Sequence, residues 1–366
     1  MLSISVCMIV KNEASCIESC LSSVSKYVRE IIVVDTGSID ETKEIALKYT
    51  SNVYEFQWIN DFSAARNFAI SKASQSVILM MDADEMLNPE SLPLLMKYCA
   101  EPNGSAGRVR QVNQLGNGET GVIEIARLMP NDKTMKYTGR IHEQITKIDG
   151  DPPRVISTGV ELFHSGYSKE VIMDQNKIKR NLDLLTLELS DHPDNPYIWY
   201  QLGKTNYVAE KYLKANSQFQ QAIDLVVGKN DLPPYLPNLL VSYVYSLLKT
   251  KEFDKILSIV EVCTDLYPDF TDIYFVYGIV LMELKDINQI EQIRETFEYC
   301  IHLGEADTSK YETVHGVGSY RAYYNLGVYY EAIGEAKKAV EYYKMAVQSG
   351  YSPAAERIKS IDSNSY

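Results

Sequence analysis

Two aspartates, Asp82 and Asp84, follow directly after the apolar run at residues 77–80. If the backbone stays extended there, both carboxylates project to the same side, because alternate residues of a strand share a face. Oxygen ligands placed in this way suit Mg²⁺ or Mn²⁺ rather than zinc. A solvated acidic turn would show the same two residues, so the pair alone leaves a metal site and a surface turn open.

The elements before this pair alternate between apolar runs and helical patterns. The runs 4–10, 30–34, 53–58 and 77–81 predict strands, and helical patterns follow the first three runs, around 17–24, 42–47 and 65–70. Such alternation requires right-handed crossovers and a parallel sheet that is covered on both faces. Ligands of these sheets lie at the carboxyl ends of the strands.

Polar residues collect at those carboxyl ends, on the loops and helix that follow: Asn12, Glu13, Asp35, Arg66, Asp82 and Asp84. Neither G-x-G-x-x-G after the first strand nor G-x-x-x-x-G-K-[ST] occurs, so the two common phosphate-binding loops are absent from the sequence. A metal would then have to neutralise more of the phosphate charge. This pattern disfavours a dinucleotide dehydrogenase and a P-loop NTPase.

Shorter apolar runs with turn signals follow a helix predicted at 89–99. They predict strands at 107–112, 121–128, 135–137, 140–148 and 155–163, with a hairpin turn at Gly116-Asn117-Gly118. We therefore expect an α/β domain with a mainly parallel sheet and an appended antiparallel part.

A different pattern begins after an amphipathic helix predicted at 168–189. Two segments match tetratricopeptide positions: Trp199, Leu202, Gly203, Ala215, Phe219 and Ala222, and then Tyr323, Leu326, Gly327, Tyr330, Ala339, Tyr343 and Ala346. The segments 235–268 and 272–303 are weaker helix pairs of the same length. Small residues at these positions let paired helices approach closely, and stacked pairs share one core. The second domain is thus expected to be all-α.

Composition limits the classes of partner. The chain has 366 residues, 45% of them hydrophobic, which is enough for two cores. A net charge of −13 argues against nucleic acid and anionic membranes and suits a basic or neutral peptide. Neither a membrane span nor a signal peptide is indicated, and six scattered cysteines without a C-x-x-C pair indicate a cytoplasmic protein.

The succession of motifs resembles a family-2 glycosyltransferase over roughly residues 1–165. The motifs are Val10-Lys11-Asn12-Glu13, Val34-Asp35-Thr36-Gly37-Ser38, W-I-N-D-F-S-A-A-R-N at 58–67 and Met81-Asp82-Ala83-Asp84-Glu85. The resemblance implies a GT-A fold and transfer of a sugar from a nucleotide diphosphate with inversion at the anomeric carbon. It also implies a divalent cation, Mg²⁺ or Mn²⁺, and a UDP-sugar donor.

The resemblance implies roles for individual residues as well. Asp35 and the loop of Asn12 and Glu13 would contact the uridine, and Arg66 the nucleotide or diphosphate. Asp84 would bind the metal, with Asp82 nearer the ribose and donor sugar, and the binding set also includes Val10 and Ala83. The family places a histidine as a further metal ligand at about the position of His164. Purely structural alternatives also exist: Asp35 could be a turn residue, and His164 could be a half-buried structural histidine.

Inverting transfer needs a base that takes the acceptor proton. Glu143 is the first candidate and His142 the second, and neighbours on a strand face opposite ways, so only one of them is expected to face the site. Glu143 could instead form a surface ion pair with Arg140 or Lys136, which would contribute little energy.

Together with G-R-I-H-E at 139–143, F-H-S-G-Y at 163–167 and the repeats, these motifs resemble the peptide glycosyltransferases of glycocin biosynthesis. That group places a hexose on cysteine or serine of a bacteriocin precursor peptide, and the repeats would hold this peptide or form a homodimer. We predict a glycosyltransferase domain at 1–166, a linker helix at 167–192 and a repeat domain at 193–366. A glycosyltransferase of polysaccharide or lipid and a non-catalytic tetratricopeptide scaffold are the alternatives.

Overall fold

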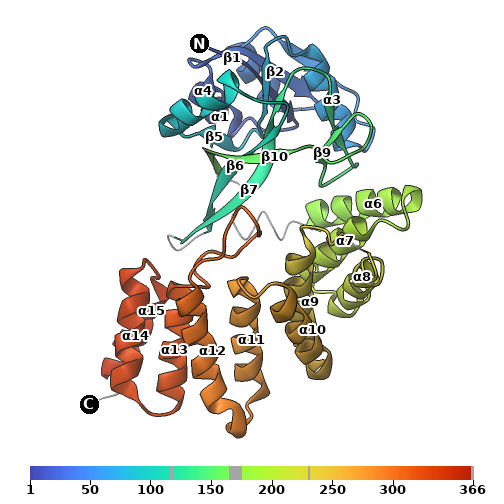
Figure 1. Cartoon of the computed structure of the whole chain (residues 1–366). Helices are drawn as coiled ribbons and strands as arrows, with labels where there is room; N and C mark the ends of the chain where they lie inside the picture. Colours follow the sequence, from blue (N-terminus) through green and yellow to red (C-terminus); the bar gives the residue numbers. More distant parts are fainter. Residues whose placement is uncertain (116–118, 165–174, 230, 364–366) are drawn as a thin grey trace. The chain divides into compact units, whose positions relative to one another are not determined.

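The computed structural model describes residues 1–115, 119–164, 175–229 and 231–363 (Figure 1). The chain forms two compact units. The first consists of Met1–Asn113, Val122–Val171 and Lys179–Asp191, and the second of Gln114–Gly121, Ile172–Ile178 and His192–Tyr366. The hairpin turn predicted at Gly116-Asn117-Gly118 and the first part of the predicted linker helix lie outside the described residues. The proposed linker overlaps helix α6, Gln175–Asp191, which contributes to both units.

A mixed sheet forms the centre of the first unit. Within the described residues its eight strands run in the order β3-β2-β1-β4-β7-β6-β10-β5. Their bounds are Leu2–Val10 (β1), Val28–Asp35 (β2), Val53–Glu55 (β3), Val77–Met80 (β4), Glu85–Leu87 (β5), Ala106–Leu115 (β6), Glu119–Pro130 (β7) and Val155–His164 (β10). Strands β8, Met135–Thr138, and β9, Gln144–Lys147, form a separate antiparallel pair.

The directions of the strands agree with the fold predicted from the sequence. Strand β1 pairs in parallel with β2 and β4, and β2 pairs in parallel with β3. Strand β7 runs antiparallel to β4, and β5 runs antiparallel to β10, whereas β10 is parallel to β6. The mainly parallel sheet with an appended antiparallel part is thereby confirmed.

Both faces of the parallel strands are buried. Ile4, Val6 and Met8 of β1 belong to a core shared with α1 and α4, whereas Cys7 belongs to a core on the opposite face, shared with α3 and the β8–β9 pair. Alternate residues of a strand face opposite sides, so a continuous apolar run is what a doubly covered strand requires. The covering helices are α1, Ile17–Val24; α2, Thr42–Leu47; α3, Phe62–Lys72; the short 3₁₀ helix η1, Pro89–Ser91; and α4, Leu92–Ala100.

Two predicted strands are shorter than expected. The run 53–58 gives only Val53–Glu55, and the run 140–148 gives only Gln144–Lys147. In the second case His142 has φ of 51° and Gly139 has φ of 96°, both in the left-handed region. Extended strands need negative φ, so β9 can begin only after His142.

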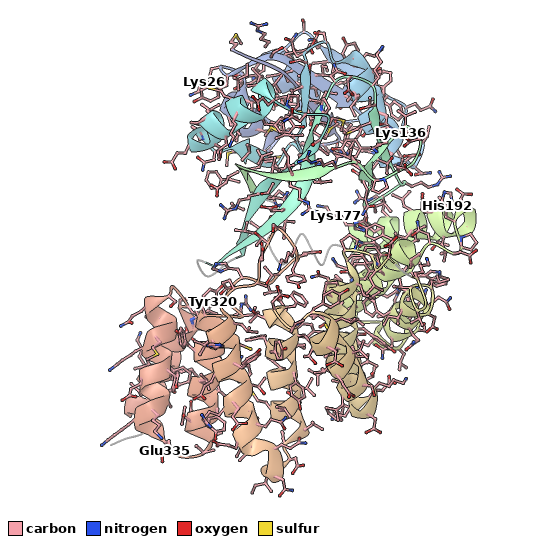
Figure 2. The ribbon with its side chains drawn as sticks, viewed as in Figure 1. Lys26, Lys136, Lys177, His192, Tyr320 and Glu335 are labelled. Atoms are coloured by element: carbon pink, nitrogen blue, oxygen red, sulfur yellow. The ribbon has the colours of Figure 1, made fainter. Side chains whose placement is uncertain are left out.

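From α7 onwards the described part of the second unit is helical, and most of its helices form pairs. Their bounds are Pro196–Val208 (α7), Tyr212–Asp224 (α8), Leu236–Thr250 (α9), Phe253–Leu266 (α10), Thr271–Leu284 (α11), Ile287–Gln289 (η2), Ile290–Leu303 (α12), Tyr320–Ala332 (α13), Ala336–Gln348 (α14) and Pro353–Ser363 (α15). Figure 2 labels Tyr320, the first residue of α13, and Glu335, the residue before α14.

One glycine-to-aromatic contact recurs in three of these pairs. A Cβ atom added to Gly203 would lie 2.5 Å from the ring of Phe219, and the corresponding distances are 2.6 Å for Gly278 with Phe297 and 2.5 Å for Gly327 with Tyr343. Such distances exclude any side chain at the glycine unless the ring moves. The glycine therefore sets how closely the helices of each pair approach, as the repeat pattern predicts.

No helix in the described part of the chain is long and apolar enough to cross a membrane. All six cysteines carry free thiols, and four of them, Cys7, Cys20, Cys263 and Cys300, are buried.

A buried carboxylate anchors the connection between α12 and α13. Asp272, at the start of α11, accepts hydrogen bonds of 2.5 Å from the Thr313 hydroxyl and 2.8 Å from the backbone N–H of Val314. Burial raises the pKa of Asp272 to about 6 despite these two bonds. The folded state therefore binds more protons than the unfolded state between about pH 4 and pH 6.

The contribution of Asp272 to stability should accordingly be largest at low pH and be lost as the pH rises through about 6. Asp272→Asn keeps an acceptor for Val314 and can donate to the Thr313 hydroxyl, so it removes the titration and preserves the contacts. Between pH 4 and pH 7 we expect the wild type to lose roughly 2 kcal/mol of unfolding free energy relative to D272N. Denaturant unfolding across this range measures the difference, and a difference that does not depend on pH would contradict the assignment.

Candidate active site

Four of the predicted site residues, Asp35, Asp82, Asp84 and His164, lie at or just after the carboxyl ends of β2, β4 and β10. Asp35 is the last residue of β2 and is paired with Val10 of β1 in the sheet register. Asp82 and Asp84 follow β4, which is the other neighbour of β1. His164 ends β10, where its register partners are Glu85 of β5 and Asn113 of β6. Sheet order alone thus collects side chains from four separate stretches of chain.

The loops after β1 and β2 hold each other. Asn12, with φ of 57°, accepts a 2.9 Å hydrogen bond from the backbone N–H of Ile39 and donates its own N–H to the Ser38 hydroxyl at 2.9 Å. The backbone N–H of Glu13 donates to the Thr42 hydroxyl at 2.8 Å. These bonds fix the Asn12–Glu13 loop beside the end of β2.

Asp35 uses one of its two oxygens for its own turn. Oδ1 accepts from the backbone N–H groups of Gly37 and Ser38, both at 2.9 Å, which is the turn role considered for this residue. Oδ2 is buried and has no hydrogen-bond partner within the described structure. A buried acceptor of this kind is costly unless a ligand or water satisfies it.

Asp82 is half-buried and lies between two buried arginines in a cluster of charged side chains. Its Oδ1 accepts from Nη2 of Arg66 at 2.9 Å, and its Oδ2 accepts from Nη2 of Arg127. Burial opposes the charge on Asp82, yet the guanidinium groups of Arg127 and Arg66 hold the pKa of its carboxyl well below its usual range. Asp82 is thus ionised at neutral pH.

The same cluster includes two further carboxylates. Glu85 is fully buried and accepts from Gln111 at 2.6 Å and from the backbone N–H of Asp82 at 2.8 Å. Burial raises the pKa of Glu85 despite the opposing charge of Arg127, which lies 3.4 Å away. Glu143 accepts from Nε of Arg66, and its side chain is only 11% exposed.

The segment of the two base candidates is a bend, and it is held at two points. The carbonyl of Gly139 accepts from the Ser63 hydroxyl at 2.5 Å, and the carbonyl of Arg140 accepts from the N–H of Phe62 at 2.9 Å. His142 is exposed, whereas Glu143 points to Arg66. The difference between the two neighbours arises from the left-handed backbone at His142, and the strand alternation expected from the sequence is wrong here. Glu143 also pairs with Arg66, and not with Arg140 or Lys136.

The turn after β4 separates the two aspartates. The strand ends at Met80, and Ala83 and Asp84 lie in a turn closed by a 3.1 Å hydrogen bond from the N–H of Glu85 to the carbonyl of Asp82. The expectation of an extended backbone with both carboxylates on one side is therefore wrong. Asp82 turns to the arginines, and Asp84 turns to His164.

Asp84 and His164 form a half-buried pair. Oδ2 of Asp84 lies 3.0 Å from Nε2 of His164, and Oδ1 of Asn113 lies 2.8 Å from Nδ1 of the same ring. Both neighbouring atoms are acceptors, so both ring nitrogens carry protons in this arrangement. Burial opposes the charged ring, but Asp84 outweighs it and raises the pKa of His164 above its ordinary value.

This pair fits a divalent cation. Nε2 of His164 and Oδ2 of Asp84 converge on the proton between them, and a cation in place of that proton would have one nitrogen and one oxygen ligand. Asn113 would keep the ring in place by accepting from Nδ1. In the parts of the chain that the structure describes, no cluster of three His, Cys, Asp or Glu side chains is arranged to hold a metal. Mg²⁺ often takes one or two protein ligands and completes its shell with substrate phosphates and water.

Sequence reasoning missed four residues of this site: Glu85, Gln111, Asn113 and Arg127. Glu85 is the last residue of the Met81-Asp82-Ala83-Asp84-Glu85 motif, and this position was the only sign of its role in the sequence. Arg127 lies on β7 between apolar residues, where a charged side chain reads as solvent-facing, yet it is 8% exposed. Its role depends on the β4–β7 pairing, which no local pattern reveals.

Known proteins share both parts of this chain. Residues 5–155 match the model of Glycosyl transferase family 2. The chain is 26% identical over 295 residues to the SPbeta prophage-derived glycosyltransferase SunS of Bacillus subtilis strain 168, which covers 76% of this chain and 67% of SunS. It is 33% identical over 217 residues to a TPR repeat-containing protein of Synechococcus elongatus, which covers 56% of this chain and 52% of that protein.

Among solved structures, the crystal structure of MamA matches with a TM-score of 0.39 and 18% identity, over 50% of this chain and 93% of MamA. The alignments span about half the length of the Synechococcus protein and about two thirds of SunS. The segment 5–155 contains the β2 and β4 strand ends with Asp35, Asp82 and Asp84. Residues 5–155 of the N-terminal unit are thus similar to glycosyl transferase family 2, and tetratricopeptide-like helical repeats follow in the same chain.

Proposed function

We propose that this chain is a metal-dependent, inverting glycosyltransferase of the cytoplasm. It would move a hexose from a UDP-sugar to a Cys or Ser side chain of a ribosomally made bacteriocin precursor. The observation that carries the proposal is the Asp84–His164 pair at the sheet end of a family-2 domain, with the buried Asp35 two strands away. The peptide acceptor is supported by the order of motifs followed by helical repeats and by the net charge of −13.

The donor would lie along the ends of β2, β1 and β4. Oδ2 of Asp35 supports a contact to the uridine, because it is a buried acceptor without a partner in the described structure. Val10 and the Asn12–Glu13 loop border the same strand end. Nη1 of Arg66 is likewise buried without a hydrogen-bond partner among the described residues, which supports a contact from Arg66 to the nucleotide or diphosphate.

Asp82 and Ala83 would lie beside the ribose and donor sugar. Both oxygens of Asp82 already accept from arginines, but a carboxylate offers about four lone-pair sites, so sugar hydroxyls can still donate to it. Its side chain is 34% exposed, which leaves room for such a contact. Mg²⁺ or Mn²⁺ held by Asp84 and His164 would neutralise charge on the diphosphate leaving group.

The chain's own residues would handle the acceptor proton. The acceptor sulfur or oxygen forms a bond to the anomeric carbon from the face opposite the diphosphate, the bond from that carbon to the diphosphate breaks, and the acceptor proton passes to a base. Glu143 is the proposed base, and Arg66 fixes its position through Oε1. His142 is the second candidate, because it is exposed on the same bend.

Intact mass measurement tests the proposal directly. The protein is incubated with UDP-glucose, Mn²⁺ and a panel of peptides that carry cysteine or serine, and a hexose is expected on a subset of them. A hexose that appears only on polysaccharide or lipid acceptors would favour the alternative class of glycosyltransferase. If UDP-glucose and several other UDP-sugars stay unchanged with every class of acceptor, the result would favour the non-catalytic scaffold.

Replacing the carboxylate of the metal pair should stop turnover. We expect Asp84→Asn to lower kcat/KM by about 100-fold or more and to weaken Mn²⁺ binding measured by calorimetry, because it removes a charged ligand. Asp151→Asn, an exposed change in the loop before β10, is the matched control and should keep full activity. Full activity of D84N would remove Asp84 from the metal site.

Replacing the proposed base should slow the transfer step without disturbing the network. Glu143→Gln keeps an oxygen for Arg66 but cannot take a proton, so we expect a loss of roughly 10²-fold in kcat with a serine peptide. His142→Gln serves as the parallel variant. A loss below about threefold in E143Q would point to His142, or to a thiolate acceptor that needs no base.

A further inference from the structure

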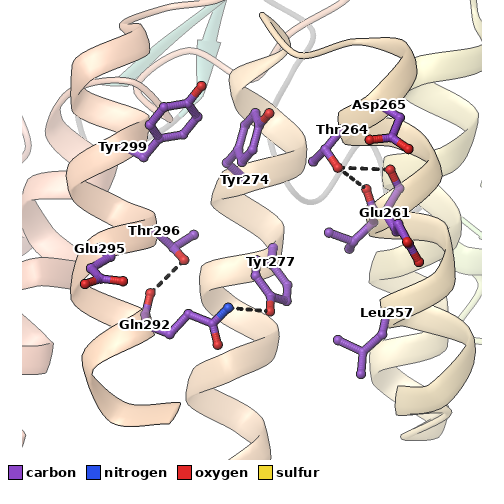
Figure 3. Close-up of a pocket in the computed structure, with 11 residues that line it drawn as sticks. Leu257, Glu261, Thr264, Asp265, Tyr274, Tyr277, Gln292, Glu295, Thr296 and Tyr299 are labelled. Atoms are coloured by element: carbon purple, nitrogen blue, oxygen red, sulfur yellow. Dashed lines mark hydrogen bonds between the residues drawn. The ribbon is translucent and has the colours of Figure 1, made fainter.

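A groove in the second unit lies between α10 and α12, the second helices of two successive pairs, and α11 forms its floor (Figure 3). It encloses about 720 Å³. Each helix presents one stripe at helical spacing: Leu257, Val260, Glu261, Thr264 and Asp265 from α10, Tyr274 and Tyr277 from α11, and Gln292, Glu295, Thr296 and Tyr299 from α12.

The groove is lined by aromatic rings whose polar ends are reachable. Tyr274 and Tyr299 meet edge to face, with ring centroids 4.8 Å apart, and Tyr277 accepts a 3.0 Å hydrogen bond from the Gln292 amide. Tyr274 and Tyr277 are half-buried and Tyr299 is 40% exposed. These rings are therefore fixed by their neighbours and still present faces to a ligand, which suits contact with cations.

Carboxylates stand on both walls. Glu261 and Asp265 are exposed on α10, and among the described residues neither is ion-paired. On the opposite wall Glu295 is 64% exposed and lies 3.8 Å from Arg294. Arg294 binds Glu291 and Glu298 more closely, each at 2.5 Å, so it compensates Glu295 only weakly.

The carboxylates and tyrosine rings of the groove together favour a positively charged ligand. Three carboxylates around tyrosine faces attract a cation by charge and by the ring quadrupole, and they repel phosphates, nucleic acid and anionic lipid. Glu261 and Asp265 are four residues apart on one helix, about 6 Å along its axis. Two basic side chains four apart on a helix, or two apart on an extended segment, have the same spacing.

We infer that this groove binds a segment of the acceptor peptide that carries two lysine or arginine side chains. The inference rests on the proposed transfer to a peptide and adds a second point of contact, separate from the Asp84–His164 pair. One basic side chain would pair with Glu261 and the other with Asp265, and Tyr274, Tyr299 and Glu295 would face them from the floor and the opposite wall of the groove. The groove would thus select acceptors by a basic segment apart from the residue that receives the sugar.

The test measures binding without any turnover. The probe is a fluorescein-labelled peptide of alternating leucine and lysine, and the control probe has glutamate in place of lysine. Anisotropy is measured on the full chain without UDP-sugar or metal, for the wild type and for the triple variant E261Q/D265N/E295Q. The matched control D231N/E283Q/E341Q removes three exposed carboxylates of the same unit that do not line the groove. Circular dichroism confirms that each variant is folded.

We expect the lysine probe to bind the wild type and the control variant with similar affinity, and the glutamate probe to bind neither. The groove variant should bind the lysine probe about tenfold more weakly, as the loss of several exposed charge contacts implies. D84N should bind the lysine probe like the wild type, since the groove lies in the other unit.

Equal affinity of the groove variant and the wild type would overturn the assignment, whatever the transfer assay shows. If the wild type binds the lysine probe but transfers sugar to no acceptor, the proposed function is contradicted. The groove would still be a binding site for cationic side chains. A wild type that sediments as a dimer, with a monomeric groove variant and unchanged probe binding, would show that a second copy occupies the groove and would also overturn the inference.

Discussion

Two buried guanidinium groups hold the carboxylate of Asp82 from both sides, and the rest of the candidate site depends on this arrangement. Arg66 comes from α3 and Arg127 from β7, so the cluster ties a helix, the end of β4 and an appended strand to one point. Buried charges are tolerated only when they are paired and hydrogen-bonded, and removing one partner costs several kcal/mol. Glu85 and Glu143 complete the pairing, so the cluster forms as a whole.

The position of Asp84 follows from that cluster. Asp82 is fixed by its arginines and its N–H is bound by the buried Glu85, and the turn that follows directs Asp84 to His164. His164 meets it there because β10 is flanked by β6 and β5. The antiparallel pairing of β5 with β10 places the residue after the D-x-D motif opposite the histidine. A carboxylate and an imidazole far apart in sequence become neighbours through sheet order.

The sequence indicated the parallel strands, the strand-end residues and the helical repeats, because each of these has a local pattern. Continuous apolar runs mark strands that are covered on both faces, and small residues at fixed intervals mark paired helices. The partners of Asp82 could not be predicted in this way. Arg127 and Asn113 act through the pairings of β7 and β6, which join segments far apart in sequence. The turn at Asp84 and the left-handed His142 were also missed, because a single residue outside the strand region reverses the side on which its neighbours lie.

The α12–α13 connection has a consequence for the integrity of the repeats. Thr313 and Val314 of this segment satisfy the buried Asp272, while Lys310 and Tyr311 bind Asp269 at the entrance to α11. The segment therefore holds the start of α11 through these bonds, in addition to connecting α12 with α13. A permuted chain with new termini cut into it would leave a desolvated carboxylate at the start of α11, whereas termini opened at the exposed Gly334 turn would leave that carboxylate satisfied.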